Sequence, residues 1–144
     1  MIHNQKRIYQ FGKYVTKKRW ISFFHQIDEI STLEPDSVLE IGVGSGILGA
    51  ILKNTFGIQY ESLDVNRELK PDYVGSVQKL PFPDRHFDVI ACFQVLEHLP
   101  YEVFEQALSE LFRVSKKAVI LSLPNARRIL RVFITKICEN LFIK

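Results

Sequence analysis

The residues best suited to chemistry begin with a glycine-rich segment that follows an apolar run. Residues 38–46 are Val-Leu-Glu-Ile-Gly-Val-Gly-Ser-Gly, and a second apolar run follows at 47–52. Glycines between a strand and a helix let the main chain approach a ligand closely, and the free N–H groups at a helix start favour polar or anionic groups. Glu40, just before the glycines, is costly to bury without partners, so it indicates a cationic or hydrogen-bonding group nearby, such as an amino-acid ammonium.

The glycine spacing by itself leaves the ligand open. Gly44-x-Gly46-x-x-Gly49 formally matches the dinucleotide-binding fingerprint. In that fold the first glycine directly follows the strand, so the motif would start at Gly42 and would need Gly or Ala where this chain has Ile47. It would also leave Glu40 without a role. A nicotinamide-dependent dehydrogenase is therefore the weaker alternative.

Alternating apolar and amphipathic segments must position these residues. Trp20, Phe23, Phe24, Ile27 and Ile30 recur at helical spacing and predict a helix over about residues 17–32. The pattern predicts strands at 38–41, 58–63, 73–74, 87–93 and 118–123, and helices at 47–52 and 104–112. Such alternation favours a mostly parallel α/β sheet, in which ligands lie beyond the carboxyl ends of the strands where the strand order reverses.

The composition favours one folded domain spanning residues 1–144, with its core at 36–125. The chain is 47% hydrophobic and 24% charged, which excludes a disordered or low-complexity protein. Cys92 and Cys138 belong to no metal-binding or disulfide pattern. No apolar run is long enough to span a membrane, and the first residues lack the apolar stretch of a signal peptide. We therefore expect a cytoplasmic protein with reduced thiols.

Segment 38–46 resembles the first motif of class I S-adenosylmethionine-dependent methyltransferases. Asp64, at the end of the second expected strand, matches the acidic residue of that family. Leu80-Pro81-Phe82, the run 87–90 and the run 95–99 resemble the small-molecule "type 11" branch. The resemblance covers about residues 36–125 and implies a Rossmann-like three-layer sandwich with a mostly parallel sheet of order 3-2-1-4-5.

The resemblance also implies a cofactor, S-adenosyl-L-methionine, and a role for each matching residue. Glu40 would reach the methionine ammonium through water, and Asp64 would hold the ribose hydroxyls. Ser76 would meet the adenine edge, where many relatives carry an aspartate that accepts hydrogen bonds more strongly. The remaining positions expected to contact the cofactor are Gly42, Gly44 and Gly46 at the methionine part, Val65 and Val77 at the adenine, and Phe93 and Gln94 at the methionine end.

The expected activity is methyl transfer to a small-molecule, carbohydrate-like or lipid-like acceptor. No catalytic residue is assigned, because methyl transfer to a reactive nucleophile depends mainly on alignment. Some similar O-methyltransferases hold a divalent ion with Glu-x-x-Glu-His, but here Gln94 replaces the first carboxylate before Glu97 and His98. We expect no metal and a structural role for these last two residues, with His98 as a general base the weaker alternative. Phe93-Gln94-Val95 also departs from the Asn/Asp-Pro-Pro-aromatic sequence of exocyclic or amide nitrogen methyltransferases.

Compared with the resembling family, we expect the carboxyl terminus to be short and to lack the usual strand pair. Residues 126–142 carry an apolar stripe and basic residues, which predict one helix. The strand at 118–123 would then be an open sheet edge, so the chain could form a homo-oligomer through this edge or the helix. A non-catalytic S-adenosylmethionine-binding or interaction protein is the alternative function, with nucleic acid or an anionic membrane surface as less favoured partners of the basic helix.

Overall fold

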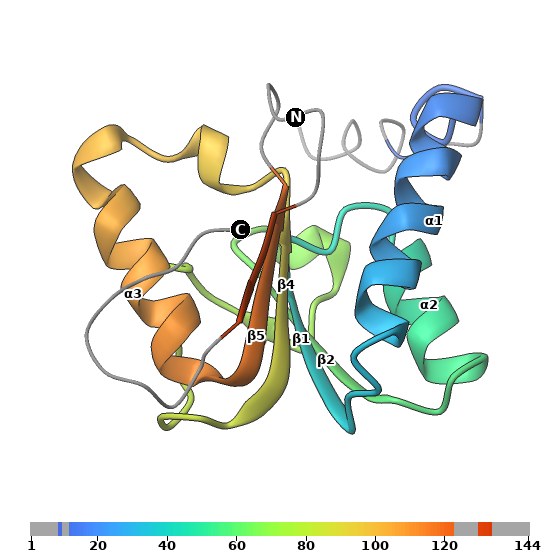
Figure 1. The fold of residues 1–144 in the computed structure, drawn as a ribbon. Coiled ribbons are helices and arrows are strands. Elements are labelled where there is room, and N and C mark those ends of the chain that lie inside the picture. Colours follow the sequence, from blue (N-terminus) through green and yellow to red (C-terminus); the bar gives the residue numbers. More distant parts are fainter. Residues whose placement is uncertain (1–8, 10–11, 123–129, 134–144) are drawn as a thin grey trace.

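The computed structural model describes residue 9, residues 12–122 and residues 130–133. These residues form one six-stranded sheet with helices on both faces (Figure 1). The strands are β1 (Ser37–Ile41), β2 (Gln59–Asp64), β3 (Tyr73–Val74), β4 (Phe87–Phe93), β5 (Ser115–Ser122) and β6 (Leu130–Phe133). The α-helices are α1 (Lys17–Ser31), α2 (Ile47–Asn54) and α3 (Phe104–Val114), and short 3-10 turns lie at Arg67–Leu69, Leu96–His98 and Tyr101–Val103.

The sheet order is β3-β2-β1-β4-β5-β6, and the strands from β1 to β5 pair in parallel. The predicted order 3-2-1-4-5 is therefore confirmed. The order reverses between β1, whose other neighbour is β2, and β4, whose other neighbour is β5. In a sheet of this kind, the carboxyl ends of β1 and β4 border the crevice where ligands bind.

The prediction for the carboxyl-terminal segment is wrong where the structure describes it. Residues 130–133 belong to β6, which pairs antiparallel with β5, and not to a helix over 126–142. The edge of β5 is therefore not open, and one antiparallel strand of the kind expected to be missing is present. The segment forms a strand because its backbone pairs with that of β5, and an apolar pattern in the sequence does not reveal such pairing. Residues 126–129 and 134–142 lie outside the described part.

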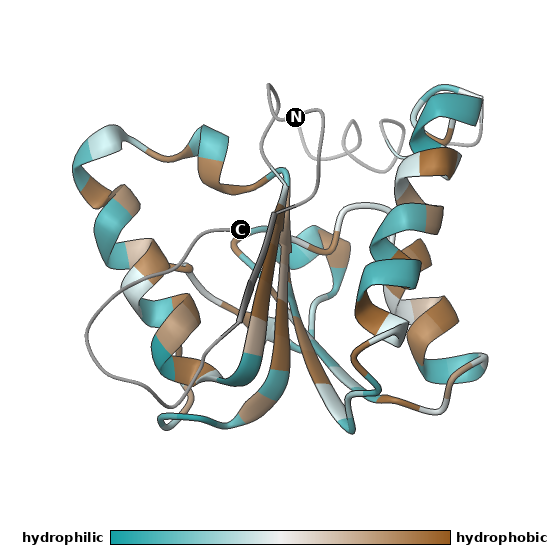
Figure 2. Cartoon of the chain, viewed as in Figure 1, coloured by the Kyte–Doolittle hydropathy of each residue, from teal (hydrophilic) through white to brown (hydrophobic). Residues whose placement is uncertain are grey.

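Alternate residues of the strands supply the cores on the two faces of the sheet. Leu39 and Ile41 pack on the α3 side with Leu111 of that helix. Val38 packs on the other side with Leu52 of α2. This alternation follows from the two-residue period of a strand, and the apolar middle of the sheet is visible in Figure 2. A strand buried on both faces explains the nearly continuous apolar runs in the sequence.

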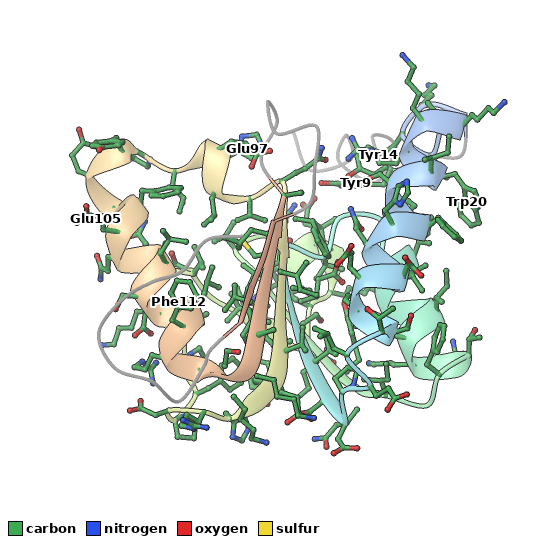
Figure 3. The ribbon with its side chains drawn as sticks, in the orientation of Figure 1. Tyr9, Tyr14, Trp20, Glu97, Glu105 and Phe112 are labelled. Carbon is green, nitrogen blue, oxygen red and sulfur yellow. The ribbon has the colours of Figure 1, made fainter. Side chains whose placement is uncertain are left out.

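Helix α1 agrees with the expected 17–32 segment, but its apolar stripe is only partly buried. Thr16 caps the helix by accepting a hydrogen bond from the Arg19 N–H at 3.3 Å. Phe23 and Ile30 are buried, whereas Trp20 is 52% exposed and Phe24 is 64% exposed. Trp20 points away from the sheet in Figure 3. Among the described residues, no helix is both long and apolar enough to cross a membrane.

Arg113 of α3 holds the proline-containing loop that leads into β4. Its guanidinium donates to the carbonyls of Leu80 at 3.1 Å and Phe82 at 2.8 Å. It also pairs with Asp84 at 2.9 Å and with Glu110 at 2.6 Å. The planar fork of an arginine suits this multiple contact, which fixes the loop against the helix.

Candidate functional site

A cavity of about 550 Å³ lies where the carboxyl ends of the central strands meet. Its lining comes from the ends of β1, β2 and β4, from the loops that follow these strands and β3, from the segment before α1 and from Arg19 in that helix. The lining residues are Tyr9, Tyr14, Arg19, Ile41, Gly42, Gly44, Leu63, Asp64, Val65, Gly75, Ser76, Val77, Phe93, Gln94, Val95, Glu97, His98 and Leu99. Of the residues predicted to bind a cofactor, all line this cavity except Glu40 and Gly46.

The glycine loop presents bare main chain to the cavity. Gly42 has φ +85° and Gly44 has φ +54°, a backbone region that side chains disfavour. A Cβ at Gly42 would come within 2.5 Å of Val95 Cγ2, so this position also needs glycine for packing. Gly46 is the N-cap of α2 and closes a tight turn with its N–H on the Val43 carbonyl at 2.9 Å. It shapes the loop without lining the cavity.

Asp64 joins the end of β2 to the glycine loop. Its Oδ2 accepts a hydrogen bond from the Val43 N–H at 2.9 Å, and its Oδ1 accepts from the Asn66 N–H at 2.8 Å. Each carboxylate oxygen has a second acceptor direction, so these bonds leave capacity for a ligand. The structure therefore brings together the glycine motif and the acidic residue that the sequence treats as separate segments.

Glu40 does not line the cavity, although the sequence analysis expects it to reach the cofactor. Its side chain is 5% exposed and accepts a hydrogen bond from the Tyr60 hydroxyl of β2. Burial raises the pKa of Glu40 to about 8, against the opposing effect of the Tyr60 hydrogen bond, and the charge of Asp64 adds to the rise. Glu40 thus lies behind the cavity wall and links two strands.

Another part of the lining comes from residues 75–77, which follow β3. Ser76 is half-buried, and its Oγ accepts a hydrogen bond from the Gln78 N–H at 3.3 Å. Val77 is buried in the α3-side core, whereas Val65, after β2, is 73% exposed. These two valines are apolar, and Ser76 adds a hydroxyl to the lining.

The end of β4 carries an unusual backbone. Gln94 has φ +55°, which is rare for a residue with a side chain. Its N–H donates to Ser122 Oγ at 3.2 Å, and its side-chain oxygen accepts a hydrogen bond from Arg19. Such backbone strain concentrates at functional sites, and here the Gln94 side chain meets Arg19 of α1.

Sequence analysis missed the residues that cover the cavity from the amino-terminal side. Tyr9 and Tyr14 pack edge to face with ring centroids 4.5 Å apart, above the strand ends and toward α1 (Figure 3). A Cβ at Gly44 would lie 3.5 Å from Tyr14 Oη. Burial raises the pKa of Tyr9, and the charges of Tyr14 and Asp64 raise it further. The aromatic side chains among residues 9–14 were the one signal in the sequence for a segment that contacts the cavity, but they follow no recognisable spacing.

Glu97 and His98 also line the cavity. Glu97 Oε2 is buried, and no hydrogen-bond partner is found for it within the described residues. Burial raises the pKa of Cys92, and the nearby charge of Glu97 adds to this effect. In the part of the chain that the structure describes, no cluster of His, Cys, Asp or Glu side chains is suited to hold a metal ion.

Comparisons with known proteins place the chain in a family. The family model described as a methyltransferase domain, type 11, matches residues 39–123, more than half of the chain. An uncharacterized methyltransferase of Schizosaccharomyces pombe is 33% identical over 99 residues, which cover 62% of this chain and 38% of that protein. A "probable S-adenosylmethionine-dependent methyltransferase" of Mycolicibacterium smegmatis is 32% identical over 100 residues, covering 61% of this chain and 38% of that protein.

Solved structures show the same fold. A protein from Pyrococcus horikoshii superposes with a TM-score of 0.62 at 15% identity, over 85% of this chain and 74% of that chain. A SAM-dependent methyltransferase from Thermotoga maritima superposes with a TM-score of 0.53 at 23% identity, over 76% of this chain and 57% of that chain. The chain spans 38% of the length of the two curated relatives. With the family model covering most of its core, the chain belongs to the type 11 family of S-adenosylmethionine-dependent methyltransferase domains.

Proposed function

We propose that this chain binds S-adenosylmethionine in the 550 Å³ cavity and supports methyl transfer to a small-molecule acceptor. One observation carries the proposal: bare glycine main chain, the Asp64 carboxylate and the strained end of β4 face the same cavity. They meet at the point where the sheet order reverses, which is the usual ligand position in such sheets.

The residues present fit a cationic nucleoside cofactor. The cavity volume lies in the range of roughly 300–1,000 Å³ that is typical of small-molecule sites. Asp64 and Glu97 give the cavity two carboxylates against the one guanidinium of Arg19, and this balance favours a ligand with positive charge. Glu97 Oε2, in the lining of this cavity, is buried and has no hydrogen-bond partner among the described residues. Buried polar atoms of this kind normally have partners, so they indicate a donor supplied by a ligand or water.

Each cavity residue has a proposed role. Asp64 holds the ribose hydroxyls while it keeps the glycine loop in place through the Val43 N–H. Val77 and Val65 pack against the adenine, and Ser76 meets its edge. Glu97, and not Glu40, receives the ammonium of the methionine part, because Glu97 lines the cavity and Glu40 does not. Gly42, Gly44, Phe93 and Gln94 shape the methionine end, and Gly46 shapes the loop.

When bound, the cofactor supplies a methyl group on a positively charged sulfur, which is a good leaving group. The protein then has to hold the acceptor in line with that methyl and to keep water away. Tyr9 and Tyr14 cover the cavity on the side of α1 and suit this exclusion of water. His98 lines the same cavity from the end of the 3-10 turn Leu96–His98, where its ring can form a hydrogen bond to an acceptor.

A non-catalytic S-adenosylmethionine-binding protein is the second candidate. The two candidates share the cofactor site and differ in turnover. Methyl transfer from the labelled cofactor to any member of an acceptor panel supports the enzyme, whereas tight cofactor binding without transfer supports the binding protein.

Calorimetry with S-adenosylmethionine, S-adenosylhomocysteine and NAD tests the proposed site. The wild-type chain should bind the first two and not NAD. Gly44→Val should abolish binding because the side chain blocks the approach of the main chain. Asp64→Ala should weaken it by about 1–3 kcal/mol through loss of hydrogen bonds to the ribose.

Two matched variants separate binding from folding. Gly57 has φ +65° and open space around its Cα, so Gly57→Val carries similar backbone strain away from the cavity. Asp72 accepts hydrogen bonds from the Ser62 N–H at 2.9 Å and the Ser62 hydroxyl at 2.7 Å, also away from the cavity. Gly57→Val and Asp72→Ala should keep cofactor affinity. Equal affinity in all five proteins would reject the site.

A further inference from the structure

A second cavity, of about 400 Å³, adjoins the cofactor cavity. Tyr14, Arg19 and Gln94 line both cavities and form their common wall. The rest of its lining comes from the segment before α1 and from the first turns of that helix: Lys13, Thr16, Lys18 and Ser22. A molecule in this second cavity would therefore lie directly beside one in the first.

The two cavities differ in charge. The first contains the carboxylates of Asp64 and Glu97, whereas every charged residue of the second is a cation. In the described part of the chain, none of Lys13, Lys18 and Arg19 forms an ion pair with a carboxylate. The hydroxyls of Thr16 and Ser22 add neutral hydrogen-bonding groups. Unpaired cations around a concave surface favour an anionic ligand.

The common wall is held in place before any ligand arrives. The Arg19 guanidinium carbon lies 4.3 Å from the Tyr14 ring centroid, and the guanidinium donates to the Gln94 side chain. Gln94 itself has the strained φ of +55°. A guanidinium has five N–H donors, so the bond to Gln94 leaves others free for a carboxylate or phosphate group. An arginine fixed by stacking loses less freedom when it binds an anion.

We propose that the second cavity binds the methyl acceptor by an oxyanion, a carboxylate or a phosphate group, through Lys13, Lys18 and Arg19. This inference rests on the proposed function and specifies the acceptor class. The charge difference keeps the cationic cofactor and the anionic part of the acceptor in separate cavities. The common wall brings the remainder of the acceptor toward the methionine end of the first cavity.

Titration of the full chain saturated with S-adenosylhomocysteine tests this site. Inorganic phosphate and acetate are added in separate arms at constant ionic strength, and amide chemical shifts are followed by NMR. At least one anion should shift the amides of Tyr14, Lys18 and Gln94 in a saturable manner, and the arm that binds more tightly identifies the oxyanion. Lys13→Gln/Lys18→Gln should weaken this binding by about tenfold or more, because charge-assisted hydrogen bonds are lost.

The control removes the same charge outside both cavities. Lys17 neighbours Lys18 on α1 and Lys53 lies on α2, and neither lines a cavity, so Lys17→Gln/Lys53→Gln should leave anion binding unchanged. Equal weakening in both double variants, or shifts that do not saturate, would overturn the inference. A loss of S-adenosylhomocysteine affinity in Lys13→Gln/Lys18→Gln would assign the cations to the cofactor instead. Failure of the wild type to bind S-adenosylhomocysteine would overturn the proposed function itself.

Discussion

Glu40 and Asp64 stand near the ends of adjacent strands, yet their surroundings differ. Asp64 faces the cavity and accepts hydrogen bonds from main-chain N–H groups. Glu40 is buried and accepts a hydrogen bond from Tyr60. A carboxyl that is buried without a cation favours its neutral form, so the pKa of Glu40 rises to about 8. Glu40 therefore links two strands through Tyr60, whereas Asp64 lines the cavity.

Glu40 should make stability depend on pH. Its pKa is raised from 4.5 to about 8 in the folded chain, so the folded state binds an extra proton between these values. Stability is therefore greatest at the acidic end of this range and decreases as the pH rises toward 8. Glu40→Gln keeps an acceptor for Tyr60 and removes the titration. Urea unfolding between pH 5.5 and 8.5 should show a steeper loss of stability in the wild type, and parallel pH profiles for the two proteins would contradict this account.

Residue types and spacing were enough to predict that the glycine loop and Asp64 lie close together, because each lies at the carboxyl end of a strand. They were not enough to separate Glu40 from the cavity. That separation depends on Tyr60 in the neighbouring strand, and strand register is a tertiary property. Tyr9, Tyr14 and Arg19 reach the cavity only through the placement of α1 and the segment before it, which no local motif specifies.

Helix α2 and strand β2 approach each other closely at Gly49. A Cβ at this position would lie 2.4 Å from Tyr60 Cζ, and Gly49 has no unusual φ. The third glycine of the formal dinucleotide fingerprint is therefore a packing residue in this chain. The aromatic ring over it carries the hydroxyl that binds Glu40.

Gly49→Ala should destabilise the protein by about 1–3 kcal/mol, because overpacking displaces the Tyr60 ring. Helix propensity alone predicts the opposite sign, a gain of about 1 kcal/mol when alanine replaces glycine inside a helix. Denaturant unfolding of the two proteins therefore distinguishes packing from propensity. A variant more stable than the wild type would show that the ring moves aside at little cost.

Elements with strong local patterns were predicted with nearly correct ends, as for the strand at 87–93 and helix α1. The segment at 130–133 was not. Its apolar residues fit a helical stripe and a strand equally well, and pairing with β5 decides between them. The exposed Trp20 illustrates a related limit, because periodicity locates an apolar stripe without showing how much of it meets the core.

Across the whole molecule, Asp88 connects the amino-terminal ends of the central strands, far from the cavity. Its Oδ2 accepts hydrogen bonds from the Asp36 N–H at 2.9 Å and from Lys117 at 3.0 Å. Its N–H donates to Ser37 Oγ at 3.0 Å, and Lys116 lies 3.5 Å from Oδ1. Burial alone would raise the pKa of Asp88, but the hydrogen bonds from Lys117 and Asp36 and the lysine charges outweigh it and lower the pKa.

Asp88→Asn should reduce stability by about 1–3 kcal/mol at neutral pH, because charge-assisted hydrogen bonds to a buried group are lost. A lowered pKa stabilises the folded state above the ordinary aspartate range, and this contribution disappears as the pH falls through the folded value. The difference between variant and wild type should therefore shrink in acid. Cofactor affinity should not change. A variant that loses affinity while keeping its stability would contradict this division between structural and binding carboxylates.

The family and the parallel sheet could be predicted for the molecule as a whole, because several motifs occur in the right order along the chain. The charge contrast between the two cavities could not, because it joins residues from the start of the chain with the end of β4. Only the fold shows which cations share a concave surface.

A crystal structure of this chain grown with S-adenosylhomocysteine tests the central claim most directly. The account predicts the nucleoside in the cavity at the ends of β1, β2 and β4, with its ribose hydroxyls within hydrogen-bond distance of Asp64. It also predicts the amino-acid part along the Gly42 and Gly44 main chain, with its ammonium at Glu97. A ligand bound outside this cavity, or one whose ribose does not contact Asp64, would contradict the account.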